Sequence, residues 1–164
     1  ADQEINIVYV GVTPKWHKEI TLSALNSKKH VICEKPISLT NHDANIMVEA
    51  ARLSNTLTCI NLPFRWTPAV MKFKEKLAEG YVGNIKRIAL RFRFPMWPRS
   101  WQITDWLSKK EQGGALREVG THFFFALKEF EPWIGHITKV WAKVVYEPEL
   151  GAEWSAIGIM ETSS

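Results

Sequence analysis

The first third of the chain alternates short apolar runs with segments of helical spacing, and this alternation limits the possible folds more than any other feature. The apolar runs cover 5–10, 30–33 and 56–60, and each is short and rich in β-branched residues. Such a run is typical of a strand covered on both faces. Helices are expected over 15–26 and after Thr40, which can cap the second one. The order strand, helix, strand, helix, strand predicts a parallel sheet with right-handed crossovers.

Polar residues follow each of the three predicted strands. Thr13-Pro14 follows the first strand, Glu34-Lys35-Pro36 the second and Asn61 the third. The carboxyl ends of parallel strands meet at one edge of a sheet, where open α/β sheets bind ligands. A lysine in such a crevice can take part in proton transfer. A solvated loop lysine is the other interpretation of Lys35, and the spacing alone favours it.

Beyond a boundary near residues 61–68 the pattern changes. It predicts, in order, a helix, a strand, a loop, a helix and two strands, over 67–80, 84–94, 95–112, 113–130, 137–146 and 154–160. The strand over 84–94 alternates apolar and basic side chains, as in an antiparallel sheet with one wet face. The sequence therefore predicts an α/β domain over 1–64 and an α+β domain over 65–164.

Two clusters in the second half could take part in chemistry. Glu118 and His122 are four residues apart, so they share one face of the predicted helix. The carboxylate could orient the histidine or stabilise its protonated form, or the two could be an ordinary surface pair. Trp97, Trp101 and Trp106 crowd the preceding loop. They could stack on a sugar ring or close over a ligand, although such a cluster more often forms the core of its own loop.

Composition excludes several classes of function. The net charge of +4 comes from 21 basic and 17 acidic residues that are interspersed, which favours a mildly basic soluble surface over nucleic-acid binding. No apolar stretch is long enough to span a membrane, and the histidines show no metal-ligand spacing. Cys33 and Cys59 lie in apolar runs, so we expect two buried, reduced thiols and a cytoplasmic protein.

Three segments together resemble the glucose–fructose oxidoreductase / inositol dehydrogenase (Gfo/Idh/MocA) family. They are 8–17, with its Thr-Pro pair and following histidine, 31–36, with Glu-Lys-Pro, and 113–122, with Gly-Gly before Gly-x-His. The resemblance implies an NAD(P)-dependent dehydrogenase of sugars, cyclitols or related alcohols, with NAD or NADP as cofactor. It also implies that 1–64 is the second half of a Rossmann-type parallel sheet. Residues 65–164 would begin a substrate and oligomerisation domain with a mainly antiparallel sheet.

The resemblance further implies roles for individual residues. Those implied in catalysis are Lys35, His122 and Glu118. Those implied in substrate binding are Lys35, Trp101, Glu118 and His122. Those implied in cofactor binding are Thr13, Pro14, His17, Glu34, Lys35, Pro36, Asn61 and Arg65. No metal is implied. Two positions depart from the family pattern, since Glu118 and Phe125 stand where many members carry aspartate.

The absence of a glycine-rich GxGxxG turn before Glu34 is the largest departure. It leads us to expect a segment of a longer enzyme, without the N-terminal glycine-rich turn and the C-terminal strands. These 164 residues are then predicted not to bind NAD(P) tightly. The longer enzyme is expected to take a sugar-like substrate and to form a homo-oligomer through its antiparallel sheet. Two alternatives are a truncated, non-catalytic relative that acts as an interaction module, and an unrelated sugar-binding module that uses the loop over 95–112 with its three tryptophans, here called the tryptophan loop.

Overall fold

The computed structural model describes residues 2–149 and 151–163. The chain divides into two compact units, 1–62 and 63–164, and each is described by itself. In the described residues, no helix is long and apolar enough to cross a membrane.

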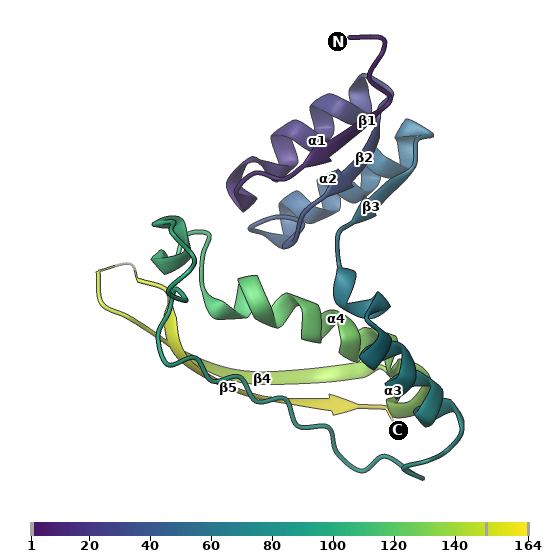
Figure 1. Ribbon diagram of the computed structural model, residues 1–164, viewed down its shortest axis with the longest axis vertical. Coiled ribbons are helices and arrows are strands. Elements are labelled where there is room, and N and C mark those ends of the chain that lie inside the picture. Colours follow the sequence, from purple (N-terminus) through teal and green to yellow (C-terminus); the bar gives the residue numbers. More distant parts are fainter. Residues whose placement is uncertain (1, 150, 164) are drawn as a thin grey trace. The chain divides into compact units, whose positions relative to one another are not determined.

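The first unit is the predicted α/β layer (Figure 1). Its strands are β1 (Ile7–Val10), β2 (His30–Cys33) and β3 (Thr58–Ile60). Its helices are α1 (His17–Asn26), which follows a 3₁₀ turn over Pro14–Trp16, and α2 (Asn41–Ser54). The strands pair in parallel in the order β1-β2-β3, which confirms the predicted topology. Thr40 caps α2 as expected, because its hydroxyl accepts a hydrogen bond from the Asp43 amide at 3.1 Å.

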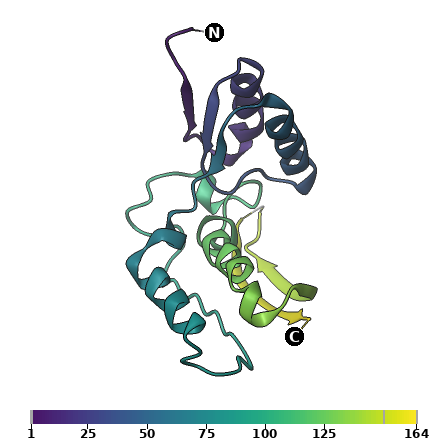
Figure 2. The same ribbon diagram turned by 90° about the vertical axis from the view of Figure 1, so that its right-hand side faces the viewer.

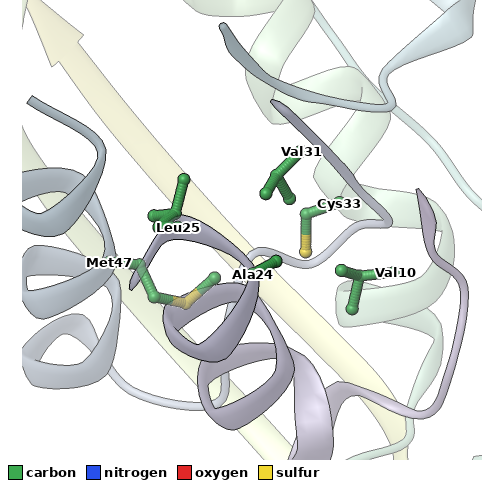
Figure 3. Close-up of a cluster of buried hydrophobic side chains, with 6 residues drawn as sticks. All are labelled: Val10, Ala24, Leu25, Val31, Cys33 and Met47. Carbon is green, nitrogen blue, oxygen red and sulfur yellow. The ribbon is translucent and has the colours of Figure 1, made fainter. Parts of the chain in front are cut away.

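The core of this unit lies between the sheet and both helices. Figure 3 shows its buried side chains, which are Val10, Val31 and Cys33 from the strands and Ala24, Leu25 and Met47 from the helices. Figure 2 shows both helices on the same side of the strands. Burial also raises the pKa of the Cys33 thiol to about 11, so this cysteine is uncharged at neutral pH.

The other face of the sheet corrects two expectations. We expected strands covered on both faces, but the side chains of Ile7 and Tyr9 are 56% and 59% exposed. Cys59 was expected to be buried and is exposed. The cause is the pleat of the sheet, which turns alternate side chains away from α1 and α2. Within the described residues of the first unit, neither helix packs against that second face, so the apolar composition predicted more burial than the unit provides.

The second unit combines helices with an antiparallel hairpin. Its helical elements are η2 (Pro63–Trp66), α3 (Pro68–Ala78), η3 (Trp106–Ser108), η4 (Leu116–Gly120), α4 (Thr121–Glu129) and α5 (Glu131–Ile134). Its strands, β4 (Ile137–Tyr146) and β5 (Glu153–Thr162), pair with each other. The two expected strands and the helix after Gly113-Gly114 are thus confirmed. That helix starts as the π-helical turn η4 and continues as α4.

The predicted strand over 84–94 is wrong. This stretch is irregular and no strand of the described residues pairs with it. Its alternation has one real consequence, since Phe92 packs against Phe123 of α4 with ring centroids 4.8 Å apart. Ile88 and Leu90, which should share that face, are exposed instead. A strand needs a hydrogen-bonded neighbour as well as an alternating pattern, and β4 and β5 take each other as partners.

Candidate functional site

The backbone places Glu34 and Asn61 side by side at the carboxyl edge of the parallel sheet. The Glu34 amide donates to the carbonyl of Val10 at 3.0 Å, and the Asn61 amide donates to the carbonyl of Cys33 at 2.8 Å. These bonds continue the sheet ladder past the ends of β1 and β2. The residues after the strands are therefore fixed by the same hydrogen bonds that fix the strands.

The Glu34 carboxylate is the centre of a hydrogen-bond network at this edge. Its Oε1 accepts from the Tyr9 hydroxyl at 2.5 Å and from Nδ2 of Asn61 at 2.7 Å. Its Oε2 accepts from the Lys35 amide at 3.2 Å. Partial burial acts to raise the pKa of Glu34, but these donors outweigh it and hold the pKa below its ordinary value. The same bond raises the pKa of Tyr9, so at neutral pH the pair is a carboxylate and a neutral phenol.

The side chain of His17 contacts the backbone of two loops at the same edge of the sheet. Its ring is fully buried. Nδ1 lies 2.8 Å from the carbonyl oxygen of Pro36, and Nε2 lies 3.0 Å from that of Val12. One loop follows β1 and the other follows β2. The histidine thus connects the loop that holds Thr13 and Pro14 with the Glu-Lys-Pro segment, because its ring contacts a backbone carbonyl in each.

The remaining predicted residues of this edge lie in those two loops. Thr13 is half-buried and directly precedes the 3₁₀ turn that Pro14 begins, and Pro14 is buried. Lys35 is half-buried, and its peptide bond to Pro36 is cis. The loops therefore present Lys35 and Glu34 next to one another at the end of β2.

In the second unit, the helix that carries His122 begins where only glycine fits. A Cβ on Gly113 would lie 2.3 Å from the carbonyl oxygen of Trp106. Gly114 has a φ of +103°, and its Cα faces the carboxylate of Glu153 on β5. That carboxylate accepts from the Leu116 amide at 2.6 Å. The Gly-Gly pair thus permits close packing of the tryptophan loop, β5 and the first turn of this helix.

His122 itself is buried and stacks on an aromatic ring. Its centroid lies 4.1 Å from that of Phe64, with 16° between the planes. One turn earlier, Oε2 of Glu118 lies 2.9 Å from Nη2 of Arg99. The Arg99 guanidinium covers the Trp101 ring at 4.6 Å from its centroid. The tryptophan loop therefore supplies a cation to Glu118, the carboxylate that shares a helix face with His122.

Arg65, in the same unit, contacts one acidic side chain and two aromatic rings. Its guanidinium lies 2.8 Å from Oε1 of Glu129 and covers the rings of Trp66 and Phe125. Phe125 stands where many relatives were expected to carry a second aspartate. Here its ring supports an arginine through a cation–π contact.

Comparison with known proteins identifies the family to which this fold belongs. Residues 1–61 match the model of the Gfo/Idh/MocA oxidoreductase family, which is described as having an NAD-binding Rossmann fold. The chain belongs to this family. Its fold class, a parallel sheet followed by an antiparallel one, is that of solved family structures.

Three relatives illustrate how much of a family member this Gfo/Idh/MocA chain represents. It is 33% identical to 1,5-anhydro-D-fructose reductase of Ensifer adhaerens over 123 residues, which are 74% of the chain and 36% of the reductase. An inositol dehydrogenase homologue from Azotobacter vinelandii, solved with NADH and myo-inositol, superposes with a TM-score of 0.81 at 23% identity. It matches 96% of this chain and 41% of its own. A 3-ketoreductase of Actinomadura kijaniata, solved with NADP and TDP-benzene, superposes with a TM-score of 0.80 at 24% identity. The match covers 99% of this chain and 48% of the ketoreductase. The chain spans about a third of the length of the curated relatives it matches.

The structure brings together only some of the residues predicted for the Gfo/Idh/MocA site. Glu34 and Asn61 are in contact, and His17 contacts the Pro36 carbonyl. Lys35 belongs to the first unit and His122 to the second, so their cooperation stays a prediction. Arg65 also lies in the second unit.

Sequence reasoning missed two side chains of these networks in the Gfo/Idh/MocA chain. Tyr9 was counted only as part of an apolar run, although its hydroxyl reaches Glu34. Arg99 was not considered, although it pairs with Glu118. A polar tip on a strand residue next to the Glu-Lys-Pro segment was the available signal for Tyr9. For Arg99 the only signal was its place between Trp97 and Trp101.

Proposed function

We propose that this chain supplies the nicotinamide side of an NAD(P)-dependent oxidoreductase, acting on a sugar, cyclitol or related alcohol or carbonyl compound. Its first unit is the dinucleotide-binding part and its second unit the substrate part. The observation that carries the proposal is the network at the sheet edge, where Glu34 and Asn61 meet beside Lys35. Family membership and the sugar and polyol ligands in the names of its relatives support the choice of substrate class.

The residues of the sheet edge fit one part of a nicotinamide cofactor. Glu34 is an ionised acceptor, suited to the hydroxyl groups of a ribose. The loop around Thr13 and Pro14 and the Lys35-Pro36 segment would flank it, held together by His17. In the described residues, the loop after β1 offers the pyrophosphate no glycine-rich cradle, since Gly11 is a single glycine and the Tyr9 ring covers the side where a Cβ would stand. The fit therefore favours the nicotinamide end of the cofactor.

Two side chains would take part in the chemistry, His122 as a proton acceptor and Lys35 as a positive charge. The cofactor, when bound, accepts or returns the hydride. Oxidation of an alcohol also requires loss of the hydroxyl proton. His122 is buried and can accept that proton, and the Lys35 ammonium can stabilise the negative charge that develops on the oxygen. Glu118 and Trp101 would border the substrate, with Arg99 holding the Glu118 carboxylate in place.

Two NMR titrations test the cofactor part of the proposal. NADH or NADPH, added at millimolar concentration because no glycine-rich turn is present, should shift the amides of Glu34, Lys35 and Asn61. Glu34→Ala should abolish those shifts, and the exposed Glu147→Ala should preserve them. Shifts that spread evenly over the chain, or their complete absence, would contradict the proposal.

A turnover assay tests the catalytic part. Reduced nicotinamide should appear when the protein is mixed with millimolar NAD or NADP and a panel of cyclitols and sugars. Lys35→Ala and His122→Ala should each lower the rate at least about 100-fold. His42→Ala, on an exposed residue of α2, is the matched control. A rate that is insensitive to both catalytic substitutions would rule out this pair.

We also propose that the β4–β5 hairpin is a contact between copies of the chain. Trp141, Ile157 and Ile159 share one face of the hairpin by register and are 58%, 64% and 63% exposed. An exposed apolar sheet face of this kind marks an interaction surface. Sedimentation analysis should show dimers or larger species that dissociate in Trp141→Lys. Monomers at every concentration would count against this contact.

A further inference from the structure

Tyr9 lies on β1, directly before the loop that the proposed function assigns to the cofactor. Its side chain points to the uncovered face of the sheet and its ring lies over Gly11, where a Cβ would come within 2.5 Å of Cε1. From there its hydroxyl reaches across to Oε1 of Glu34, which follows the neighbouring strand. Tyr9 is therefore a side chain of the sheet edge itself, although its position in the sequence is that of a strand residue.

The two oxygens of the Glu34 carboxylate have different surroundings. Oε1 accepts two strong hydrogen bonds, from Tyr9 at 2.5 Å and from Asn61 at 2.7 Å. Oε2 receives one bond from the described part of the chain, from the Lys35 amide at 3.2 Å. A carboxylate oxygen can accept about two hydrogen bonds. Oε1 is thus filled by protein donors, and Oε2 retains capacity for a donor from outside the protein.

We propose that Tyr9 is a positioning residue for ligand binding: with Asn61 it fixes Oε1 of Glu34, so that Oε2 faces the edge and accepts a hydrogen bond from a ribose hydroxyl. The inference rests on the proposed function, because it takes the nicotinamide ribose as the ligand. Tyr9 acts through Glu34 and need not touch the ligand. Three consecutive strands contribute to the arrangement, since Tyr9 lies in β1 while Glu34 and Asn61 follow β2 and β3. A rotation of the carboxylate would break both bonds at once.

The first test measures the carboxylate without any ligand. In protein labelled with ¹³C at glutamate, the Cδ signal of Glu34 is assigned through Glu34→Gln and followed against pH. The midpoint should lie below that of an ordinary glutamate, in agreement with the donors around it. Tyr9→Phe removes only the hydroxyl and keeps the ring over Gly11, so the midpoint should rise. Tyr81→Phe, on an exposed tyrosine of the second unit, should leave it unchanged.

The second test measures the ligand. NADH titrations followed at the Lys35 amide should show about five-fold weaker binding for Tyr9→Phe than for wild type and Tyr81→Phe, as expected for loss of one hydrogen bond. The chosen substitution keeps the fold intact because Tyr9 is more than half exposed, and circular dichroism checks this.

The outcomes separate the two proposals. An unchanged Glu34 midpoint in Tyr9→Phe overturns the positioning role, whatever NADH does. A raised midpoint with unchanged NADH affinity also overturns it, because the carboxylate would then not need the hydroxyl for binding. If NADH shifts no signal in any variant, the proposed cofactor edge fails, and the role of Tyr9 toward a ribose fails with it. The midpoint alone would then report that the network exists.

Discussion

The Arg99 guanidinium and the Glu118 carboxylate meet at 2.9 Å, joining the tryptophan loop to the helix that carries His122. Both side chains are mostly buried, with 30% and 19% of their surface exposed. Arg99 also lies over Trp101, so the exposed indole and the acidic residue share one cation. Glu118 is thereby turned toward a protein partner. Its longer side chain, compared with the aspartate usual in the family, is used to reach a residue nineteen positions earlier.

Arg99→Met tests this ion pair. It removes the Arg99 guanidinium from a partly buried carboxylate, so we expect a loss of about 1–2 kcal/mol in the free energy of unfolding, measured in urea. The double variant Arg99→Met/Glu118→Gln should recover part of that loss. Arg52→Met, which breaks an exposed pair with Glu49, should change stability by less than about 0.5 kcal/mol. If Arg99→Met and Arg52→Met lost equal free energy of unfolding, the partly buried ion pair would contribute no more to stability than the exposed one.

Glu34 should make stability depend on pH in a defined direction. Its pKa is lower in the folded protein than the value of about 4.5 in the unfolded chain, so the unfolded state binds the proton first. The carboxylate therefore stabilises the fold above pH 4.5, and this contribution is lost as the pH falls through the folded pKa. Glu34→Gln should be less stable than wild type at neutral pH and approach it in acid. Urea unfolding at several pH values measures the difference, with Glu147→Gln as control. A difference that grows in acid would refute the assignment.

Gly113→Ala should be strongly destabilising. The new Cβ would collide with backbone oxygens of Trp106 and Leu107, and a backbone cannot move aside as a side chain can. We expect a loss of about 2–4 kcal/mol, measured by thermal or urea unfolding. Gly80→Ala is a matched control, since Gly80 has a positive φ of +71° but nothing within 4 Å of its Cβ position. It should lose about 1 kcal/mol from backbone strain alone. Similar losses at the two glycines would show that the tryptophan loop shifts freely.

His17→Phe should loosen the edge loops while keeping the size of the side chain roughly constant. The phenyl ring cannot bond to the carbonyl oxygens of Val12 and Pro36, so the partly buried contacts of the His17 ring with these two carbonyls are lost. We expect a loss of about 2–3 kcal/mol. Faster amide hydrogen exchange should appear in the loops after β1 and β2. His42→Phe, at an exposed position of α2, should do neither. Intact protection of both loops in His17→Phe would show that the backbone holds them unaided.

Two general rules predicted the first unit and part of its site. The period of the apolar residues gave the order of strands and helices, and parallel pairing then placed Glu34 and Asn61 at one edge. Their contact through Oε1 and Nδ2 agrees with that placement. The Gly113-Gly114 pair was noticed for its resemblance to a family. Its physical reason, the closeness of Trp106 and Glu153, is visible only in three dimensions.

The parts that escaped prediction depend on partners far apart in the sequence. Periodicity assigns Tyr9 to a face of a strand but does not say that its hydroxyl reaches Glu34, 25 positions later. Arg99 contacts Glu118 because the irregular tryptophan loop folds back onto the helix that carries His122. The stretch 84–94 had the alternation of a strand without a neighbour to pair with. Local pattern thus predicted elements well, and side-chain partners only where the sheet itself set the spacing.

The uncovered side of the three-stranded sheet has a practical consequence for handling the protein. β1 is an outer strand, and in the described residues its far edge has no strand beside it. Ile7 lies on the exposed face of the same strand. Open backbone groups beside an apolar surface are a template for strand addition between molecules. Concentrated solutions of this chain should therefore self-associate through β1 as well as through the hairpin, and a charged residue in place of Ile7 should improve solubility.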